Sequence, residues 1–138
     1  MKKKCETEDC CHEAVVVIDY KMKMQAKYFR ETQTLHFGKR GISWHGAMLQ
    51  FFSLENSDDS TAAHLNKFYF DHIPEDENKQ DRASVFSLVE AIVLAIKAKF
   101  PDIKQLTFVS DNASCYQNTM ILLVLPIISS AYGITITR

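Results

Sequence analysis

Residues 106–116, Leu-Thr-Phe-Val-Ser-Asp-Asn-Ala-Ser-Cys-Tyr, begin as an apolar β-strand and end in small polar residues that favour the start of a helix. Asp111 follows the strand directly, so we expect it at the strand's carboxyl end. Ligands of open α/β sheets bind outside the carboxyl ends of the strands. This stretch therefore predicts an α/β fold and makes Asp111 a candidate binding residue.

A second stretch has the same pattern. Residues 14–20, Ala-Val-Val-Val-Ile-Asp-Tyr, lead another apolar strand into Asp19. If the two strands are parallel neighbours, we expect the carboxylates of Asp19 and Asp111 within roughly 4–7 Å of each other, close enough to share one or two divalent ions. The alternative for Asp111 is a turn or capping role, because Ser-Asp-Asn-Ala-Ser is also a good turn sequence.

Length and composition indicate one globular domain. The chain has 138 residues, of which 46% are hydrophobic and 24% charged, so the composition favours neither a disordered nor a fibrous protein. We expect a polar, cysteine-containing arm over residues 1–13 and a single domain over residues 14–138. The arm contains four residues that could be soft metal ligands, Cys5, Cys10, Cys11 and His12. The alternative is that the cysteines are free reduced thiols and that no metal binds.

The net charge of -1 conceals two segments of opposite sign. Residues 14–45 contain six basic and two acidic residues, whereas residues 55–81 contain two basic and eight acidic residues. A basic segment directly after Asp19 is suited to a phosphate backbone, and a solvated surface is the alternative explanation. Lys21, Lys23, Lys39 and Arg40 are the candidate nucleic-acid-binding residues.

The sequence predicts neither secretion nor a membrane span. The basic start is followed by polar residues 5–13, where a signal peptide needs an apolar segment, and the longest apolar run, Ile121 to Ile128, has eight residues and includes Pro126. Three of the four cysteines lie in the first eleven residues, which is not a disulfide framework. We therefore expect a reducing compartment, nuclear or cytoplasmic.

Hydrophobic periodicity and turn residues predict the order strand, strand, strand, helix, strand, helix, strand. The expected strands cover residues 14–24, 42–54, 67–73, 105–110 and 134–137, with a loop over 25–41 and a turn-rich break over 55–60. The first helix is expected over 82–99 with Asp81 as its N-cap, and the second is expected to start at Asn112 or Ser114 and to kink or end at Pro126.

This order, with an aspartate on the first strand and another after the fourth, is that of ribonuclease-H-like domains. Three segments also resemble the catalytic domains of eukaryotic DDE-type transposases and of proteins derived from transposons. They are residues 17–23 (Val-Ile-Asp-Tyr-Lys-Met-Lys), 37–46 (Phe-Gly-Lys-Arg-Gly-Ile-Ser-Trp-His-Gly) and 109–116 (Val-Ser-Asp-Asn-Ala-Ser-Cys-Tyr). The resemblance implies a five-stranded mixed sheet flanked by helices, with strands one to three antiparallel and strands four and five parallel to strand one.

The resemblance also implies two divalent ions, Mg²⁺ or Mn²⁺, that act on the phosphodiester bonds of DNA. Asp19 matches the first acidic ligand and Asp111 the second. The third is expected on a helix after strand five, beyond Arg138, so we expect a domain that lacks its last helix and is inactive as this 138-residue chain. Glu90 could imitate a helix-borne acid, although a solvated position is the better explanation. No small-molecule cofactor is expected.

Two other functions compete with the nuclease interpretation. One is a non-catalytic protein- or DNA-interaction module on the same fold, and the other is a doubly wound domain with a wholly parallel sheet that uses Asp111 alone. Four histidines without ligand spacing are expected at the surface or in packing: His36, His45, His64 and His72. Trp44 and the run Phe68, Tyr69 and Phe70 are expected in the core, with base-stacking platforms as the alternative.

Overall fold

The computed structural model of the protein describes residues 12–25, 29–34, 41–57, 60–73, 80–111, 113–117 and 119–138. Its strands are β1 (Glu13–Met24), β2 (Ile42–Ser57), β3 (Ser60–His72), β4 (Gln105–Ser110) and β5 (Thr135–Thr137), and its longer helices are α2 (Arg82–Lys99) and α3 (Thr119–Tyr132). None of the helices among these residues is long and apolar enough to cross a membrane.

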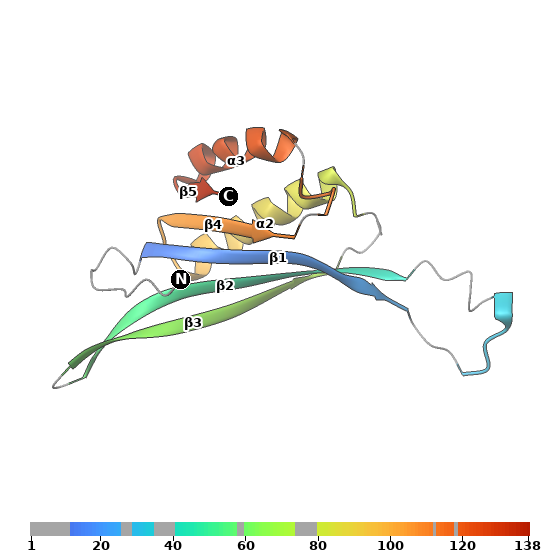
Figure 1. Cartoon of the computed structure of the whole chain (residues 1–138), viewed down its shortest axis with the longest axis horizontal. Coiled ribbons are helices and arrows are strands. Elements are labelled where there is room, and N and C mark those ends of the chain that lie inside the picture. The colour runs from blue at the N-terminus through green and yellow to red at the C-terminus, as the bar shows by residue number, and fades with distance from the viewer. Residues whose placement is uncertain are drawn as a thin grey trace.

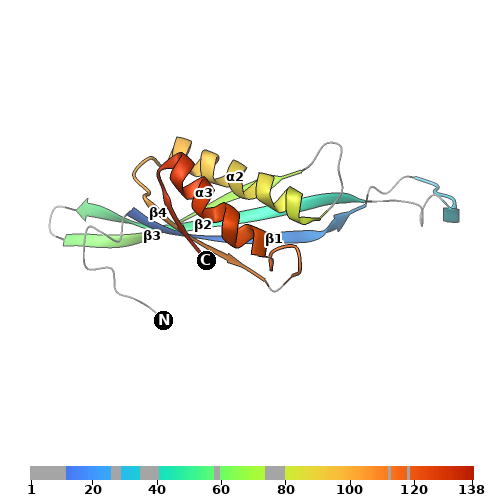
Figure 2. The ribbon, with the colours of Figure 1, turned by 90° about the horizontal axis from the view of Figure 1, so that it is seen from above.

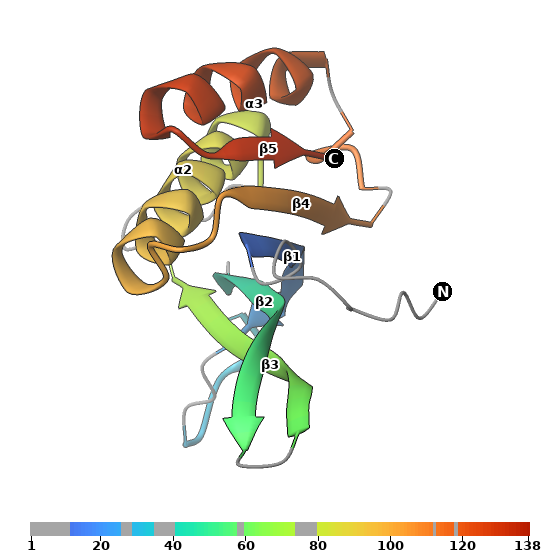
Figure 3. The same ribbon diagram turned by 90° about the vertical axis from the view of Figure 1, so that its left-hand side faces the viewer.

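The five strands form one mixed sheet in the order β3-β2-β1-β4-β5. β1 pairs antiparallel with β2, and β2 pairs antiparallel with β3, whereas β4 lies parallel to both β1 and β5. Figure 3 shows this order from one edge of the sheet to the other. The predicted strand directions are therefore confirmed, and the wholly parallel sheet of a doubly wound domain is excluded.

Both helices pack on the same face of the sheet (Figures 1 and 2). Side chains alternate between the two faces of a strand, and in β1 the buried residues Ala14, Val16 and Ile18 lie on the face that the helices cover. The core continues into α2 through a buried stripe that includes Val89 and Ile92. The opposite face, which we call the open face, is covered by none of the described residues and exposes apolar side chains of several strands, Val15, Tyr69 and Val109 among them.

The N-terminus of α2 has the predicted cap. The Asp81 side chain accepts a hydrogen bond from the Ser84 backbone N–H at 3.0 Å, and the basic residues Lys97 and Lys99 lie in the last turn. Acidic caps at the start of a helix and basic residues at its end both complement the helix dipole. The bounds predicted for this helix are confirmed.

Several predicted boundaries are wrong. β2 and β3 pair continuously from His45 opposite His72 to Ser57 opposite Ser60, so the expected break over 55–60 belongs to a long hairpin, and β3 begins seven residues before the expected start at residue 67. Backbone pairing along the ladder outweighs the low strand propensity of residues 60–66. α3 starts at Thr119, later than the expected start at residue 112 or 114, and β5 starts one residue later than expected. Of the two expectations for Pro126, an end of the helix is wrong, because Pro126 lies inside α3.

The aromatic residues of β2 and β3 divide between the two faces. Phe68 and Phe70 are half-buried and pack against the core, as predicted. Tyr69 points the other way and is 68% exposed, so the expectation that it belongs to the core is wrong. Because its neighbours in the sequence face the helices, strand alternation places Tyr69 on the open face. Trp44 is half-buried on that same face.

Candidate functional site at the carboxyl ends of β1 and β4

Asp19 and Asp111 occupy neighbouring positions at one end of the sheet. The last pair in the parallel ladder of β1 and β4 is Ile18 and Ser110, and each aspartate is the next residue along its strand. Both side chains are exposed. The expectation that the two strands are parallel neighbours is thus confirmed. Asp111 leaves the sheet directly after β4, whereas Asp19 stays within β1, which continues to Met24 and remains paired with β2.

Asp111 also shapes the connection to α3. Its Oδ1 accepts the Ala113 backbone N–H at 3.0 Å, and the Ala113 carbonyl accepts the N–H groups of Tyr116 and Gln117, each at 3.0 Å. These bonds form a compact turn directly after β4. The turn role that was the alternative for Asp111 is therefore present, but an ionised carboxylate has about four lone-pair sites, so one hydrogen bond leaves capacity for other ligands.

Asp19 lies on the open face, because Tyr20 beside it packs against the core on the other face. Its partner in β2 is Gly46, and the partner of Gly46 in β3 is Asp71, so two aspartates flank a glycine in one row across the sheet. A Cβ on Gly46 would lie 3.1 Å from Cε of Lys21, whose side chain crosses above the glycine. Asp71 is an acid at this end of the sheet that the sequence analysis did not single out.

Lys21 is already engaged on the open face. Its ammonium lies 3.8 Å from the Asp71 carboxylate and 4.5 Å from the centre of the Trp44 ring, and the Trp44 indole N–H donates to the same carboxylate at 2.7 Å. Lys23 is exposed two residues further along β1, where the pairing with β2 becomes irregular between Lys21 and Met24. Lys39 and Arg40, the other predicted nucleic-acid-binding residues, lie outside the described residues.

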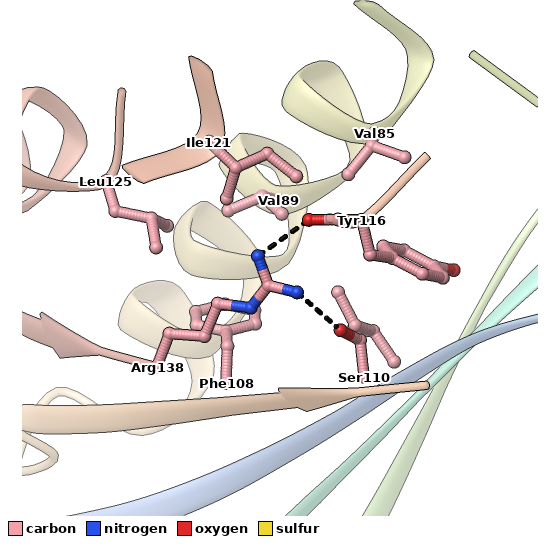
Figure 4. Close-up of a pocket in the computed structure, with 9 residues that line it drawn as sticks. Val85, Val89, Phe108, Ser110, Tyr116, Ile121, Leu125 and Arg138 are labelled. Carbon is pink, nitrogen blue, oxygen red and sulfur yellow. Dashed lines mark hydrogen bonds between the residues drawn. The ribbon is translucent and has the colours of Figure 1, made fainter. Parts of the chain in front are cut away.

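Arg138 reaches the carboxyl end of β4 from the other side (Figure 4). Its guanidinium donates to the Tyr116 carbonyl at 2.6 Å and to the Ser110 hydroxyl at 3.2 Å. The small cavity beneath it has a volume of about 10 Å³ and is lined mainly by core side chains such as Val89 and Phe108. A cavity of this volume holds at most about one water molecule, so it has no room for a substrate.

A buried layer of rings lies under the carboxylates on the helix-covered face. Tyr20 and His45 make an edge contact with ring centres 4.8 Å apart, and Tyr116 stacks on Tyr20 at 6.0 Å. His72 lies opposite His45 with ring centres 6.0 Å apart. His45 is only 1% exposed. The prediction that His45 and His72 serve in packing agrees with these contacts but does not account for their polar atoms.

Burial shifts the pKa values of this layer. Burial, and then the neighbouring His72, lowers the pKa of His45 from 6.5 to about 4. Burial also lowers the pKa of His72, against an opposing effect of Asp71, and raises the pKa of Tyr20 to about 12. Both imidazoles are therefore neutral at pH 7, the form in which imidazole accepts a hydrogen bond or binds a metal.

Cys115 lies between the carboxylates and the buried rings. Burial raises the pKa of its thiol, and the negative charges of Asp111 and Asp19 raise it further against hydrogen bonds from the backbone. A thiol with a raised pKa carries little thiolate at pH 7, so this cysteine is poorly suited to be a nucleophile. Burial, most of all, also raises the pKa of the Tyr116 phenol, and Cys115, Tyr20 and the same two carboxylates raise it further.

Two other predicted candidates lie away from this site. The Glu90 carboxylate accepts the Tyr132 hydroxyl at 2.6 Å, so it connects α2 to α3 and takes no part with Asp19 and Asp111. His12 Nδ1 lies 2.8 Å from the Asp102 carbonyl, whereas Cys5, Cys10 and Cys11 are outside the described residues. Among the residues that are described, no group of three His, Cys, Asp or Glu side chains is arranged to hold a metal ion.

Comparison with known proteins gives one match. The model of a protein family described as a domain of unknown function (DUF8701) matches residues 1–138. No curated protein and no solved structure matches the chain.

Proposed function

The chain belongs to the DUF8701 family, and we propose that it is a ribonuclease-H-like domain of transposase ancestry that binds DNA through one divalent ion held by Asp19 and Asp111. The observation that carries the proposal is the register of β1 and β4, in which Asp19 and Asp111 directly follow the last pair of the parallel ladder, Ile18 and Ser110. The sheet order β3-β2-β1-β4-β5 supports the proposed fold class, because it pairs the strands in the way that the resemblance implies.

The donor set fits a single hard cation. Mg²⁺ and Mn²⁺ prefer oxygen ligands, and proteins commonly bind Mg²⁺ through one or two carboxylates together with water and substrate phosphates. Asp19 and Asp111 would hold the ion, which when bound would offset the negative charge of a phosphate. The hydrogen bond from Ala113 fixes the orientation of the Asp111 carboxylate before any ion binds.

The surroundings favour binding over cleavage. Two-ion phosphodiester cleavage needs enough anionic ligands for both ions, and the described residues bring two carboxylates to this end of β1 and β4. Asp71, the next acid across the sheet, is held by Lys21 and Trp44. The Arg138 guanidinium donates to the Ser110 hydroxyl and so adds positive charge at the end of β4. We therefore propose that the chain binds DNA without cutting it.

Basic side chains extend this site along β1. Lys21 lies on the same face as Asp19 and Lys23 is exposed two residues further along β1, so phosphates bound at the ion would continue toward them. Lys39 and Arg40 remain predicted contributors from outside the described residues. A DNA backbone that follows this direction would run along the open face of the sheet.

The experiment is a calorimetric titration of the 138-residue chain with Mg²⁺ and with Mn²⁺. We expect binding heat in the wild type that disappears in Asp19→Asn and in Asp111→Asn but remains in Asp102→Asn, a control at an exposed aspartate in the α2–β4 connection. Fluorescence anisotropy with a labelled DNA duplex should show binding that EDTA weakens. A silent titration in the wild type would contradict the proposal.

The second candidate function is a protein-interaction module, and it is favoured by the apolar side chains on the open face. Val15, Tyr69 and Val109 are 39%, 68% and 45% exposed. Contiguous exposed apolar surface commonly marks a protein interface. If metal and DNA binding are both absent, this candidate becomes the better account.

A further inference from the structure

Four buried polar atoms at one place in the core have no hydrogen-bond partner among the described residues. They are Nδ1 and Nε2 of His45, Nδ1 of His72 and the hydroxyl oxygen of Tyr116. Buried polar side-chain atoms are satisfied in the large majority of cases, because desolvation without a partner is costly. A group of four such atoms, two of them on a side chain that is 1% exposed, indicates that this place receives a ligand.

The two histidines are arranged as a pair. His45 in β2 and His72 in β3 are directly opposite in the antiparallel register, which brings their Cβ atoms to about 5 Å. Their ring centres are 6.0 Å apart and their planes meet at 57°. Zinc lies about 2 Å from a histidine nitrogen, so the centres of two rings that share one ion are at most roughly 6 Å apart. Small rotations of the two side chains therefore allow one ion to bind between them.

The protonation states suit a metal. Histidine binds metals only when a ring nitrogen is deprotonated, and burial keeps both imidazoles neutral at pH 7. The charged or titratable groups around the pair are Tyr20 from β1, Asp71 from β3, and Cys115 and Tyr116 from the connection to α3. The raised pKa of the Tyr116 phenol keeps it protonated, so its hydroxyl can donate to a water or anion bound on the ion.

We propose that His45 and His72 form a transition-metal site for Zn²⁺ or a similar divalent cation, completed by a water or anion that Tyr116 orients. Imidazole nitrogens select zinc, copper and nickel, whereas the carboxylates of Asp19 and Asp111 select magnesium and manganese. The two sites lie on opposite faces of the sheet. An ion between β2 and β3 would also fix Tyr116, which belongs to the turn that follows Asp111.

The test uses the 138-residue chain with Cys5, Cys10 and Cys11 replaced by serine, so that thiols of the arm do not compete for the metal. After treatment with EDTA and its removal, the protein is titrated with Zn²⁺ by calorimetry and with Co²⁺ by visible absorption. We expect one bound ion, and with excess Zn²⁺ a rise in Tm of about 5 °C or more. His72→Ala and His45→Phe should each weaken binding by about ten-fold or more.

The controls separate this site from others. His64→Ala changes an exposed histidine of β3 and should leave Zn²⁺ binding unchanged. Asp19→Asn and Asp111→Asn, which test the proposed magnesium site, should also leave Zn²⁺ binding unchanged. His72 is half-buried near the end of β3, so His72→Ala gives an answer even if His45→Phe does not fold, which circular dichroism would reveal. Absence of Zn²⁺ binding, or binding that His72→Ala leaves unchanged, would overturn the proposal.

Discussion

Acid should destabilise the metal-free protein mainly through His45. Its side chain is 1% exposed and its ring nitrogens have no hydrogen-bond partner among the described residues, so the native state strongly disfavours the imidazolium form. The pKa is lowered from 6.5 to about 4. The unfolded chain therefore takes up a proton near pH 6.5 that the native chain does not accept. The contribution of the neutral His45 to the free energy of unfolding is therefore fully present above pH 6.5 and is lost as the pH falls toward 4.

The size of the effect follows from the two pKa values. The difference between 6.5 and about 4 corresponds to a loss of about 3 kcal/mol in the free energy of unfolding once both states are protonated. At pH 5 the unfolded state is almost fully protonated and the native state is not, so about 2 kcal/mol is already lost. Domains have total stabilities of about 5–15 kcal/mol, so this loss is readily measured. His72, whose pKa is also lowered, adds a smaller effect of the same sign.

The assay is urea unfolding in EDTA at pH about 7.5 and about 5, with His45→Phe as the test variant. Phenylalanine keeps an aromatic ring of similar volume but has no titratable nitrogen. The loss of stability between the two pH values should be about 2 kcal/mol smaller in His45→Phe than in the wild type. The exposed His64 provides the control, because His64→Gln should lose as much stability as the wild type. Equal losses of stability between the two pH values in the wild type and in His45→Phe would refute the assignment of the acid sensitivity to His45.

Three further predictions test the helices and their ends by urea unfolding. Asp81→Ala removes the helix cap that accepts the Ser84 N–H and should lower the free energy of unfolding by about 1 kcal/mol. An unchanged stability would contradict this role of Asp81. Gly133→Ala should also cost about 1 kcal/mol, because Gly133 has a φ of 61°, which disfavours residues with a side chain. A steric clash is not the cause, since an added Cβ would meet no atom closer than 3.8 Å. An unchanged midpoint of urea unfolding would argue against this backbone conformation. Pro126→Ala should stabilise the protein by about 1 kcal/mol or more, because the backbone N–H of alanine can donate a hydrogen bond within α3. A loss of stability would indicate that the proline ring is needed for packing.

The parts of the fold that the sequence predicts well are those with a strong local signal. α2 combines helical periodicity with an N-terminal cap and basic residues at its end, and all three act within a few residues. The beginning of β1 and the whole of β4 are apolar runs that are each followed by an aspartate, and the parallel pairing of the two strands is consistent with the helix α2 that precedes β4. These elements were sufficient to predict that Asp19 and Asp111 lie at the same end of the sheet.

The hairpin was harder to predict because its extent depends on pairing between strands. Residues 60–66 have weak strand propensity, so the start of β3 cannot be recognised until it is paired with β2. A signal was nevertheless present. The innermost pair of the hairpin is Ser57 and Ser60, and counting outward from this pair places His45 opposite His72. The histidine pair could therefore be inferred once the innermost pair of the hairpin was known, whereas the spacing of the histidines along the chain gives no such signal.

The opposite chemistry of the two proposed sites follows from one step along β1. Asp19 points to the open face, where water and a phosphate backbone can reach it, and Tyr20 points to the helix-covered face, where it contacts His45. A slip of one residue would exchange these environments and bury a carboxylate among aromatic rings. Gly46, opposite Asp19 in β2, leaves room for Lys21 to cross toward Asp71. A Cβ at this position would lie 3.1 Å from the Lys21 Cε, so the lysine side chain would have to shift. The register of β1 on β2 thus keeps oxygen ligands on one face of the sheet and imidazole ligands on the other, so loss of one site should leave the other intact.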